Sequence, residues 1–415
     1  MKVLIALPVE HKTYRSIDDI IKGHAPVNGT DGSFIRLAGL LTEAGIEVCL
    51  STASPVSACQ FRSINHRDVK AEEFDHLIVH QEHWNGTSLT FGNHVLAKTY
   101  LWLHLEVNKG LVYTFLQNGG HRVICPSQYL AKWYRMLPKW QNKVVVIPNL
   151  HCPIFRPILA SESEESTLRL LFIGALGLGK GLIELTQIWS YLAQRQVALE
   201  FAIAGSISLY QDDLAGEAGL AEPTLENTVI LPWLKSLPKD YQPKFLGSLS
   251  PKQLQIEIAK SWAVIVNPSP VHPETFCISA VEAEACDRTV FSVRAGALPE
   301  TVYHDKFNSL GEGDAVESVC ERIIEGLSHP EQVAENGKLA GNYVRRRFDN
   351  QVISTMWIAM LNGQPINSGL PKFGDSFQGV VRDVIRWSRM WKVINGYKDA
   401  EYQIMTALRR VKGSA

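Results

Sequence analysis

Short apolar runs alternate with stretches of helical periodicity along most of the chain, an alternation typical of a parallel sheet covered by helices. The apolar runs predict strands at residues 3–7, 47–52, 76–80, 101–104, 123–126 and 144–148, and helical spacing predicts a helix at 34–44. The layout restarts with strands predicted at 168–173, 199–204, 262–266 and 289–293, and helices at 181–195 and 279–286. The pattern therefore predicts two Rossmann-like halves, and we expect ligands in the cleft beyond the carboxyl ends of their strands.

The segment between the two halves is polar and acidic and has no hydrophobic period. Residues 157–167 are therefore predicted to be a linker, between an N-terminal domain at 1–156 and a C-terminal domain at 168–365. Residues 366–415 are predicted to be a helical tail that packs back on the N-terminal domain, since its apolar positions from residue 380 to residue 391 have helical spacing.

Composition narrows the class of protein. The 415 residues are 46% hydrophobic, which allows two or three domains, and 41 Lys and Arg balance 42 Asp and Glu. This balance argues against a nucleic-acid surface, which needs a basic excess. Seven scattered cysteines with no paired C-x-x-C spacing argue against a disulfide framework and a structural zinc site. The sequence has no uninterrupted run of 18 apolar residues and only a short apolar N-terminus, so we expect a cytoplasmic protein, with peripheral membrane contact left open.

The most informative local pattern lies at residues 268–286, where a loop joins a predicted buried strand to a helix. Glu274 is in the loop, and Glu282 lies about two turns further along. A helix N-terminus at the cleft offers free backbone N–H groups to a diphosphate, and a carboxylate further along can accept both hydroxyls of a ribose. The alternative is that Glu274 is an ordinary capping acid and Glu282 part of a solvated helix face.

This block resembles the donor-site signature of family-4 retaining glycosyltransferases, in which seven residues separate two glutamates. The positions that match that signature are Glu274, Phe276, Glu282, Ala283, Ala285 and Cys286, while Thr275, Cys277 and Asp287 replace glycines. Residues 146–157, 245–251 and 296–302 resemble three further segments of that family, in the same order. The resemblance therefore covers roughly residues 1–360.

The resemblance implies a GT-B fold, with two Rossmann-like domains facing each other across a donor/acceptor cleft. It also implies metal-independent transfer of a hexose-type sugar from a nucleotide-diphosphate donor to an acceptor hydroxyl, with retention of configuration. Glu274 would then face the hydroxyls of the donor sugar, and Glu282 would hold the ribose. The other donor-binding residues implied in this region are Ser248, Phe276, Cys277, Ile278 and Ser279.

A glycine-rich stretch at residues 172–181 nearly spells a P-loop. We reject a nucleotide triphosphatase, because residue 181 is Gly where a P-loop has the Ser or Thr that binds Mg²⁺. The stretch resembles the family loop whose arginine and lysine neutralise the leaving diphosphate. Gly174 and Lys180 match, but Ala175 occupies the arginine position. The candidates for a compensating cation are Arg36 and Arg294.

Two further segments in the N-terminal half complete the predicted donor site. The loop at residues 27–34, with Gly29 and Gly32, resembles the family's glycine-rich loop facing the donor phosphates, although a plain flexible loop is the alternative. His104, at the end of a predicted strand, resembles the family histidine that reaches the donor sugar. The predicted catalytic residues are therefore His104, Lys180 and Glu274.

The loop from residue 81 to residue 86 is the candidate acceptor wall. Its candidate residues, with the histidine that precedes it, are His80, Glu82, His83 and Trp84, and the Trp84 ring could pack against a sugar face. His80 and His83 lack a third ligand at suitable spacing, so we predict no metal site, and a purely structural role for His80 stays open.

The sequence leaves the ligands and three other functions open. UDP, GDP and dTDP all remain candidate donor nucleotides, no further cofactor is expected, and the acceptor is a sugar, a lipid-linked molecule or a small molecule. One alternative function is a nucleotide-sugar-binding protein with weak or no catalysis. The others are a GT-B-fold epimerase or phosphorylase, and a polysaccharide-synthesis scaffold that acts only with a partner protein.

Overall fold

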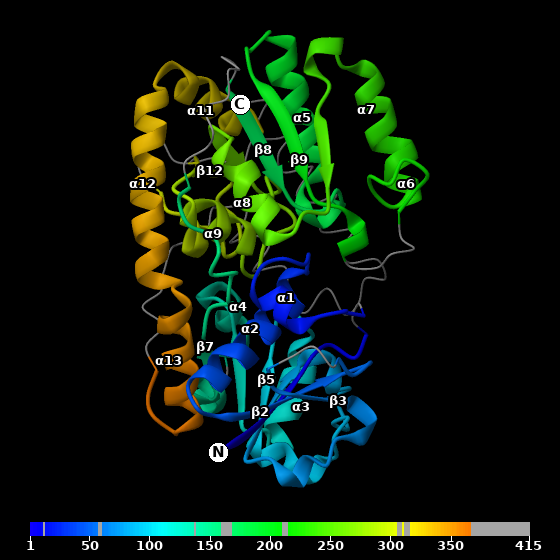
Figure 1. Ribbon diagram of the computed structural model, residues 1–415, viewed down its shortest axis with the longest axis vertical. Helices are drawn as coiled ribbons and strands as arrows, with labels where there is room; N and C mark the ends of the chain where they lie inside the picture. Colours follow the sequence, from blue (N-terminus) through cyan, green and yellow to red (C-terminus); the bar gives the residue numbers. More distant parts are fainter. Residues whose placement is uncertain are drawn as a thin grey trace.

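Two α/β halves stack along the long axis of the molecule (Figure 1). The computed structural model describes residues 1–10, 13–56, 60–136, 138–158, 168–209, 215–304, 309–310 and 316–366. Each half contains a parallel sheet, which confirms the predicted α/β class. Most of the predicted linker and nearly all of the predicted tail lie outside the described residues.

The N-terminal half is built on a sheet with the strand order β3-β2-β1-β4-β5-β6-β7. Its strands are β1 (Lys2–Ala6), β2 (Glu47–Thr52), β3 (Arg62–Asn65), β4 (His76–His80), β5 (Thr99–Trp102), β6 (Arg122–Cys125) and β7 (Val144–Val146). Strands buried on both faces have nearly continuous apolar runs, and these runs predicted every strand except β3, which is a partly exposed edge strand.

The C-terminal half repeats this layout with the order β10-β9-β8-β11-β12-β13. Its strands are β8 (Arg169–Ile173), β9 (Glu200–Ala204), β10 (Lys244–Gly247), β11 (Ala263–Ile265), β12 (Thr289–Ser292) and β13 (Ser309–Leu310). In each sheet the first strand of the half lies between its second strand and a later one, so the strand order reverses beside β1 and beside β8. Ligands of open α/β sheets bind at this point of reversal.

Helices cover both sheets (Figure 1). In the N-terminal half they are α1 (Ile17–Ile21), α2 (Gly29–Glu43), α3 (Lys109–Gln117) and α4 (Gln128–Tyr134). The rest of the chain adds α5 (Leu182–Gln194), α6 (Pro223–Leu225), α7 (Leu231–Ser236), α8 (Pro251–Ala259), α9 (Ile278–Ala285), α10 (Leu298–Thr301), α11 (Val316–Ser328), α12 (Pro330–Arg347) and α13 (Asn350–Leu361). Side-chain caps begin several of them, such as Asn28 for α2 and the Ser250–Gln253 capping box for α8.

One strand is shorter than its apolar run. β5 ends at Trp102, whereas the run predicts a strand to residue 104. The Leu103 N–H still bonds to the Ile124 carbonyl of β6 at 2.9 Å, but the His104 N–H donates to Gln81 Oε1 at 3.0 Å. His104 therefore lies in the loop after the strand, at the carboxyl edge of the sheet.

The chain returns to the N-terminal half through α12 and α13. The long helix α12 runs beside the C-terminal half, and α13 then lies beside the N-terminal half (Figure 1). Trp357 of α13 is fully buried in the N-terminal core, with its ring centroid 4.8 Å from that of Trp102. The sequence predicts that a tail at residues 366–415 packs on the N-terminal domain. The structure shows that α13, within the predicted C-terminal domain at 168–365, already does so.

Hydrogen bonds join the two halves near the cleft. The carboxylate of Glu300 accepts the backbone N–H groups of Gln128 at 2.7 Å and Tyr129 at 2.6 Å. These are the first N–H groups of α4, where a carboxylate is favoured by the helix dipole. On the other side, Gln255 Nε2 donates to the Ile154 carbonyl at 2.7 Å. The relative placement of the two halves is therefore held by specific contacts.

Replacement of the buried tryptophan tests the return of α13. We expect Trp357→Ala to lower the free energy of unfolding of the N-terminal core by about 3–5 kcal/mol, because it leaves a large cavity. Urea denaturation followed by circular dichroism measures this change. Val352→Ala, at a partly exposed position of the same helix, is the matched control and should shift stability by less than about 0.5 kcal/mol. Equal effects of the two variants would contradict the packing.

Candidate active site

A cavity of about 640 Å³ lies where the carboxyl edges of the two sheets meet. Its N-terminal wall includes Pro8, Glu10, Val27, Asn28, Gly29, Thr30, Asp31, Arg36, His80, Glu82, His104, Leu105, Asn149 and Phe155. Its C-terminal wall includes Ile173, Gly174, Ala175, Lys180, Ala204, Gly205, Leu249, Pro251, Asn267, Glu274, Thr275, Phe276, Cys277, Ile278, Ser279 and Glu282. Most of the site residues predicted from the sequence therefore line one cavity shared by both halves.

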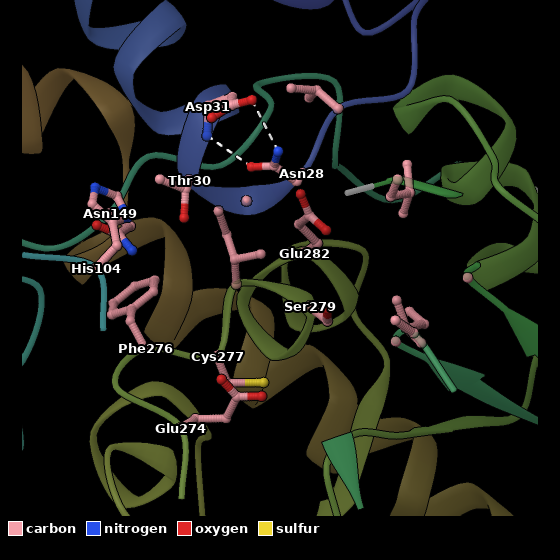
Figure 2. Close-up of a pocket in the computed structure, with 18 of the residues that line it drawn as sticks. Asn28, Thr30, Asp31, His104, Asn149, Glu274, Phe276, Cys277, Ser279 and Glu282 are labelled. Atoms are coloured by element: carbon pink, nitrogen blue, oxygen red, sulfur yellow. Dashed lines mark hydrogen bonds between the residues drawn. The ribbon is translucent and has the colours of Figure 1, made fainter. Parts of the chain in front are cut away.

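Two helix N-termini meet in this cavity. An added Cβ at Gly29, the first residue of α2, would lie 3.3 Å from Cγ2 of Ile278, the first residue of α9. The N-terminus of α2 is capped by Asn28, whose side chain accepts the Asp31 N–H (Figure 2). The N-cap of α9 is Cys277, which makes no side-chain capping bond. The first turn of α9 thus offers backbone N–H groups and a positive dipole end to an anion.

Glu274 stands at the C-terminal wall and is fixed by two polar side chains. Lys180 Nζ lies 2.8 Å from Glu274 Oε1, and Asn267 Nδ2 donates to the same oxygen at 3.1 Å. Lys180 follows the glycine-rich loop after β8, and Asn267 follows β11. Two of the predicted catalytic residues, Lys180 and Glu274, therefore form an ion pair within the cavity.

The turn at residues 296–302 positions the backbone of Glu274. Gly296 has φ +59°, and an added Cβ there would lie 2.5 Å from the Glu274 carbonyl oxygen. The same oxygen accepts the Ala297 N–H at 2.8 Å. Only glycine permits this close approach. The packing against Glu274 therefore explains why this turn has glycine at position 296, as the similar family segment does.

Glu282 lies one turn into α9 and is 9% exposed. Its carboxyl group makes no hydrogen bond or ion pair with the other described residues. Burial raises its pKa to about 7, and the positive charge of Arg36 partly opposes that shift. A buried, unpaired carboxyl group at a cavity wall is suited to accept hydroxyl groups from a ligand.

His104 is held in an aromatic layer at the N-terminal wall. Its ring lies 5.2 Å from that of Phe34 and 4.7 Å from that of Trp102, and burial lowers its pKa well below the ordinary value, so the ring is neutral. Nε2 has no hydrogen-bond partner among the described residues. The His104 carbonyl accepts the Thr275 hydroxyl at 2.6 Å across the cleft. Thr275 replaces a family glycine, and this bond gives the replacement a structural role.

Two of the predicted acceptor residues do not line the cavity. Trp84 is 1% exposed, because its ring packs edge-on against Phe115 and its Nε1 donates to the Leu111 carbonyl at 2.9 Å. His83 is also buried, with Nε2 2.7 Å from the Leu7 carbonyl, and burial lowers its pKa to about 3. The prediction of an exposed Trp84 ring was therefore wrong, while His80 and Glu82 do line the cavity.

Gly32 and Ser248 also lie off the cavity wall. Gly32 is buried in the first turn of α2, where an added Cβ would lie 2.7 Å from Nη1 of Arg36. Ser248 precedes Leu249, which lines the cavity in its place. Gly32 thus contributes space for a neighbouring side chain rather than a surface of its own.

Sequence reasoning missed several residues of the wall. Asn267 and Asn149 were not predicted, although each follows an apolar run, which is a position where polar side chains of parallel sheets gather. Of the two candidate cations, Arg36 lines the cavity and Arg294 does not. Ala175, the departure from the family arginine, lies in the wall.

The described residues contain no cluster of three or more His, Cys, Asp or Glu side chains arranged to hold a metal ion. Likewise, none of the described helices has the length and apolar character needed to cross a membrane.

Comparison of sequences gives two matches. Residues 158–340 match the family described as Glycosyl transferases group 1. The chain is 26% identical over 260 residues to a lipopolysaccharide 1,2-N-acetylglucosaminetransferase of Salmonella typhimurium (strain LT2). That match covers 57% of this chain and 63% of the relative, so it spans less than two thirds of the relative's length.

Comparison of structures gives matches over nearly the whole described fold. Sucrose-phosphate synthase from Thermosynechococcus elongatus superposes with a TM-score of 0.65 at 14% identity, over 87% of this chain and 98% of that one. Anabaena HepE in complex with UDP-glucose gives 0.62 at 15% identity, over 88% and 100%. At these identities the similarity establishes the fold, and it confirms the predicted two-domain arrangement. Residues 158–340 are therefore similar to a glycosyl transferases group 1 domain, and the chain as a whole has the GT-B fold.

Proposed function

We propose that this protein is a cytoplasmic glycosyltransferase that moves a hexose-type sugar from a nucleotide-diphosphate donor to an acceptor hydroxyl. The observation that carries the proposal is the convergence of three features in one cavity. They are the uncapped N-terminus of α9, the Lys180–Glu274 ion pair and the buried Glu282. Along a sugar nucleotide the sugar comes first, then the diphosphate and then the ribose. The Lys180–Glu274 pair, the first turn of α9 and Glu282 offer a suitable partner for each of these three groups.

In this proposal each group has one task. The N–H groups of the first turn of α9 bind the diphosphate, and Glu282 accepts the ribose hydroxyls. Glu274 faces the hydroxyls of the donor sugar, and the neutral His104 ring bonds to that sugar through Nε2. Lys180 stabilises the charge that builds on the diphosphate as the bond to the sugar breaks.

We further propose that the transfer retains configuration and needs no bound metal. Lys180 and the helix N–H groups supply positive charge at the leaving group, which is the task a metal ion performs in other transferases. The resemblance to retaining enzymes supports departure and attack on the same face of the sugar. The acceptor then enters from the wall that carries His80 and Glu82.

The donors to test first are UDP-sugars. The N-acetylglucosaminetransferase relative and the UDP-glucose complex of the structural neighbour support this choice. A thermal-shift screen with UDP, GDP, dTDP and ADP identifies the nucleotide, because a ligand that binds only the folded state raises its stability. Turnover of UDP-glucose and UDP-N-acetylglucosamine then separates a transferase from a binding protein. If the protein binds UDP but forms no UDP from either sugar nucleotide when acceptors are present, it is a nucleotide-sugar-binding protein and not a transferase. The absence of the family arginine at Ala175 also favours that alternative.

Lys180→Ala tests the role of the lysine at the leaving group. We expect kcat to fall by about 100-fold or more with a change in KM below about threefold, because the charge is needed most as the diphosphate leaves. Steady-state kinetics with the UDP-sugar substrate measures both. Lys180→Arg keeps the charge and should recover part of kcat. Lys338→Ala, at an exposed position of α12, is the control. A rise in KM equal to the fall in kcat would assign Lys180 to ground-state binding.

Glu282 predicts a pH dependence of donor binding. The carboxylate accepts ribose hydroxyls better than the protonated form does, so binding favours loss of the proton. Because the pKa of Glu282 is about 7, affinity for UDP-glucose should rise as pH rises from about 6 to about 8. UDP-glucose is the suitable ligand, since its phosphodiester groups do not titrate in this range.

Glu282→Gln should abolish that pH dependence and weaken binding at about pH 8 by roughly 10- to 100-fold, because a charged contact is lost. Calorimetric titration of the wild type and the variant at three pH values measures both effects. Glu335→Gln, which removes an exposed carboxylate of α12, controls for the loss of one acid. A wild-type affinity that stays constant across this range would remove Glu282 from the ribose site.

A further inference from the structure

Arg36 is a buried cation at the cavity wall. It lies in the second turn of α2 and is 4% exposed. Its Nη1 donates to the Leu150 carbonyl at 3.3 Å, and its Nε has no hydrogen-bond partner among the described residues. None of the ion pairs between described residues includes it. A buried charge without an ion-pair partner destabilises the folded protein. A negatively charged ligand that binds beside Arg36 would offset this destabilisation.

Among the carboxyl groups of the cavity, Asp31 accepts hydrogen bonds from Tyr14 and Asn28, and neither Glu274 nor Glu282 forms an ion pair with Arg36. Glu274 forms an ion pair with Lys180, so the negative charge of the Glu274 carboxylate is already neutralised. Glu282 is near enough to Arg36 to feel its charge, but lies beyond ion-pair distance. With its raised pKa, Glu282 is also partly protonated at neutral pH. Arg36 therefore adds to Lys180 a second positive charge at this cavity, and none of the ion pairs between described residues neutralises it.

The sequence of α2 brings the guanidinium group to the cavity. A helical side chain points back toward the helix N-terminus, and the Arg36 side chain reaches Gly32, one turn earlier. An added Cβ at Gly32 would lie 2.7 Å from Nη1 and 3.2 Å from Cζ. Glycine at this position thus leaves the space that the guanidinium occupies. One turn further, Gly29 contacts Ile278 at the start of α9.

We propose that Arg36 is the second cation of the donor site and binds the phosphate nearer the ribose. This inference rests on the proposed function, because the ligand is the diphosphate of the sugar nucleotide. Lys180 lies beside Glu274 at the sugar end of the site, and Arg36 lies near Glu282 at its ribose end. The positive charge missing at Ala175 is therefore supplied from the N-terminal half, so the donor diphosphate is held by both halves of the protein.

Arg36→Gln tests this role by comparing two ligands that differ only in the diphosphate. We expect affinity for UDP to fall by about 10- to 100-fold, because a charge-assisted contact is lost, while affinity for uridine changes by less than about twofold. Calorimetric titration of both ligands measures the difference, and Arg36→Lys, which keeps the charge, should recover part of the UDP affinity. The pH at which UDP-glucose binding reaches half its maximum should also shift upward, because the Arg36 charge lowers the pKa of Glu282.

Gly32→Ala gives a second, independent test that leaves Arg36 in the sequence. The added methyl group displaces the guanidinium, so UDP affinity should again fall while uridine affinity holds. Gly39→Ala is the matched control in the same helix, since its added Cβ would meet Gln60 and Ile21 instead of Arg36.

The outcomes separate this inference from the proposed function. Equal losses of UDP and uridine binding in Arg36→Gln, or no loss of either, would overturn the role of Arg36 and leave the transferase intact. A folded wild-type chain that binds none of UDP, GDP and dTDP would overturn both.

Discussion

The site depends on the meeting of two helix N-termini, one from each half of the chain. Gly29 begins α2, and a Cβ added there would lie 3.3 Å from Cγ2 of Ile278, which begins α9. Two positive dipole ends at this distance repel each other unless negative charge lies between them, and an anionic ligand provides that charge. The arrangement persists because other contacts hold it: α13 packs on α2, and Glu300 binds the first N–H groups of α4. The diphosphate binding that we propose thus depends on how the two halves are joined.

Carboxyl groups are more numerous than cations at the cavity wall, yet most of them are already satisfied. Asp31 accepts hydrogen bonds from Tyr14 and from the Asn28 side chain, and Glu82 accepts the Val9 N–H at 3.0 Å. Glu274 is bound by Lys180 and by Asn267. The Lys180 ammonium neutralises the charge of Glu274, whereas the neutral donors around Asp31 and Glu82 hold these carboxyl groups in place without removing their charge. A phosphate group in this cavity therefore depends on Lys180, Arg36 and the two helix N-termini for positive charge, and their attraction must exceed the repulsion from the acids of the wall.

Periodicity and short motifs predicted the parts of this site whose neighbours are close in sequence. The strands of the two sheets other than β3, β10 and β13, the start of α9 and the positions of Glu274 and Glu282 depend on local patterns and lie where the sequence indicates. Trp84 shows the limit of this reasoning, because the residues around it do not reveal that Phe115 and the Leu111 carbonyl cover its ring. The return of α13 is equally non-local, since its partner surface is more than 200 residues earlier in the chain.

The departures from the family pattern are connected to one another through the cleft. Thr275 replaces a glycine on the C-terminal wall and donates its hydroxyl to the His104 carbonyl on the N-terminal wall. A side chain that bridges the cleft stabilises the arrangement in which α2 lies against α9. In that arrangement Arg36 reaches the cavity from α2, and the positive charge absent at Ala175 can be replaced from the opposite half. In the proposed donor site this cation acts only while the halves are joined. With alanine at position 175, the proposed diphosphate binding then depends on contacts between the halves such as the Thr275 bond.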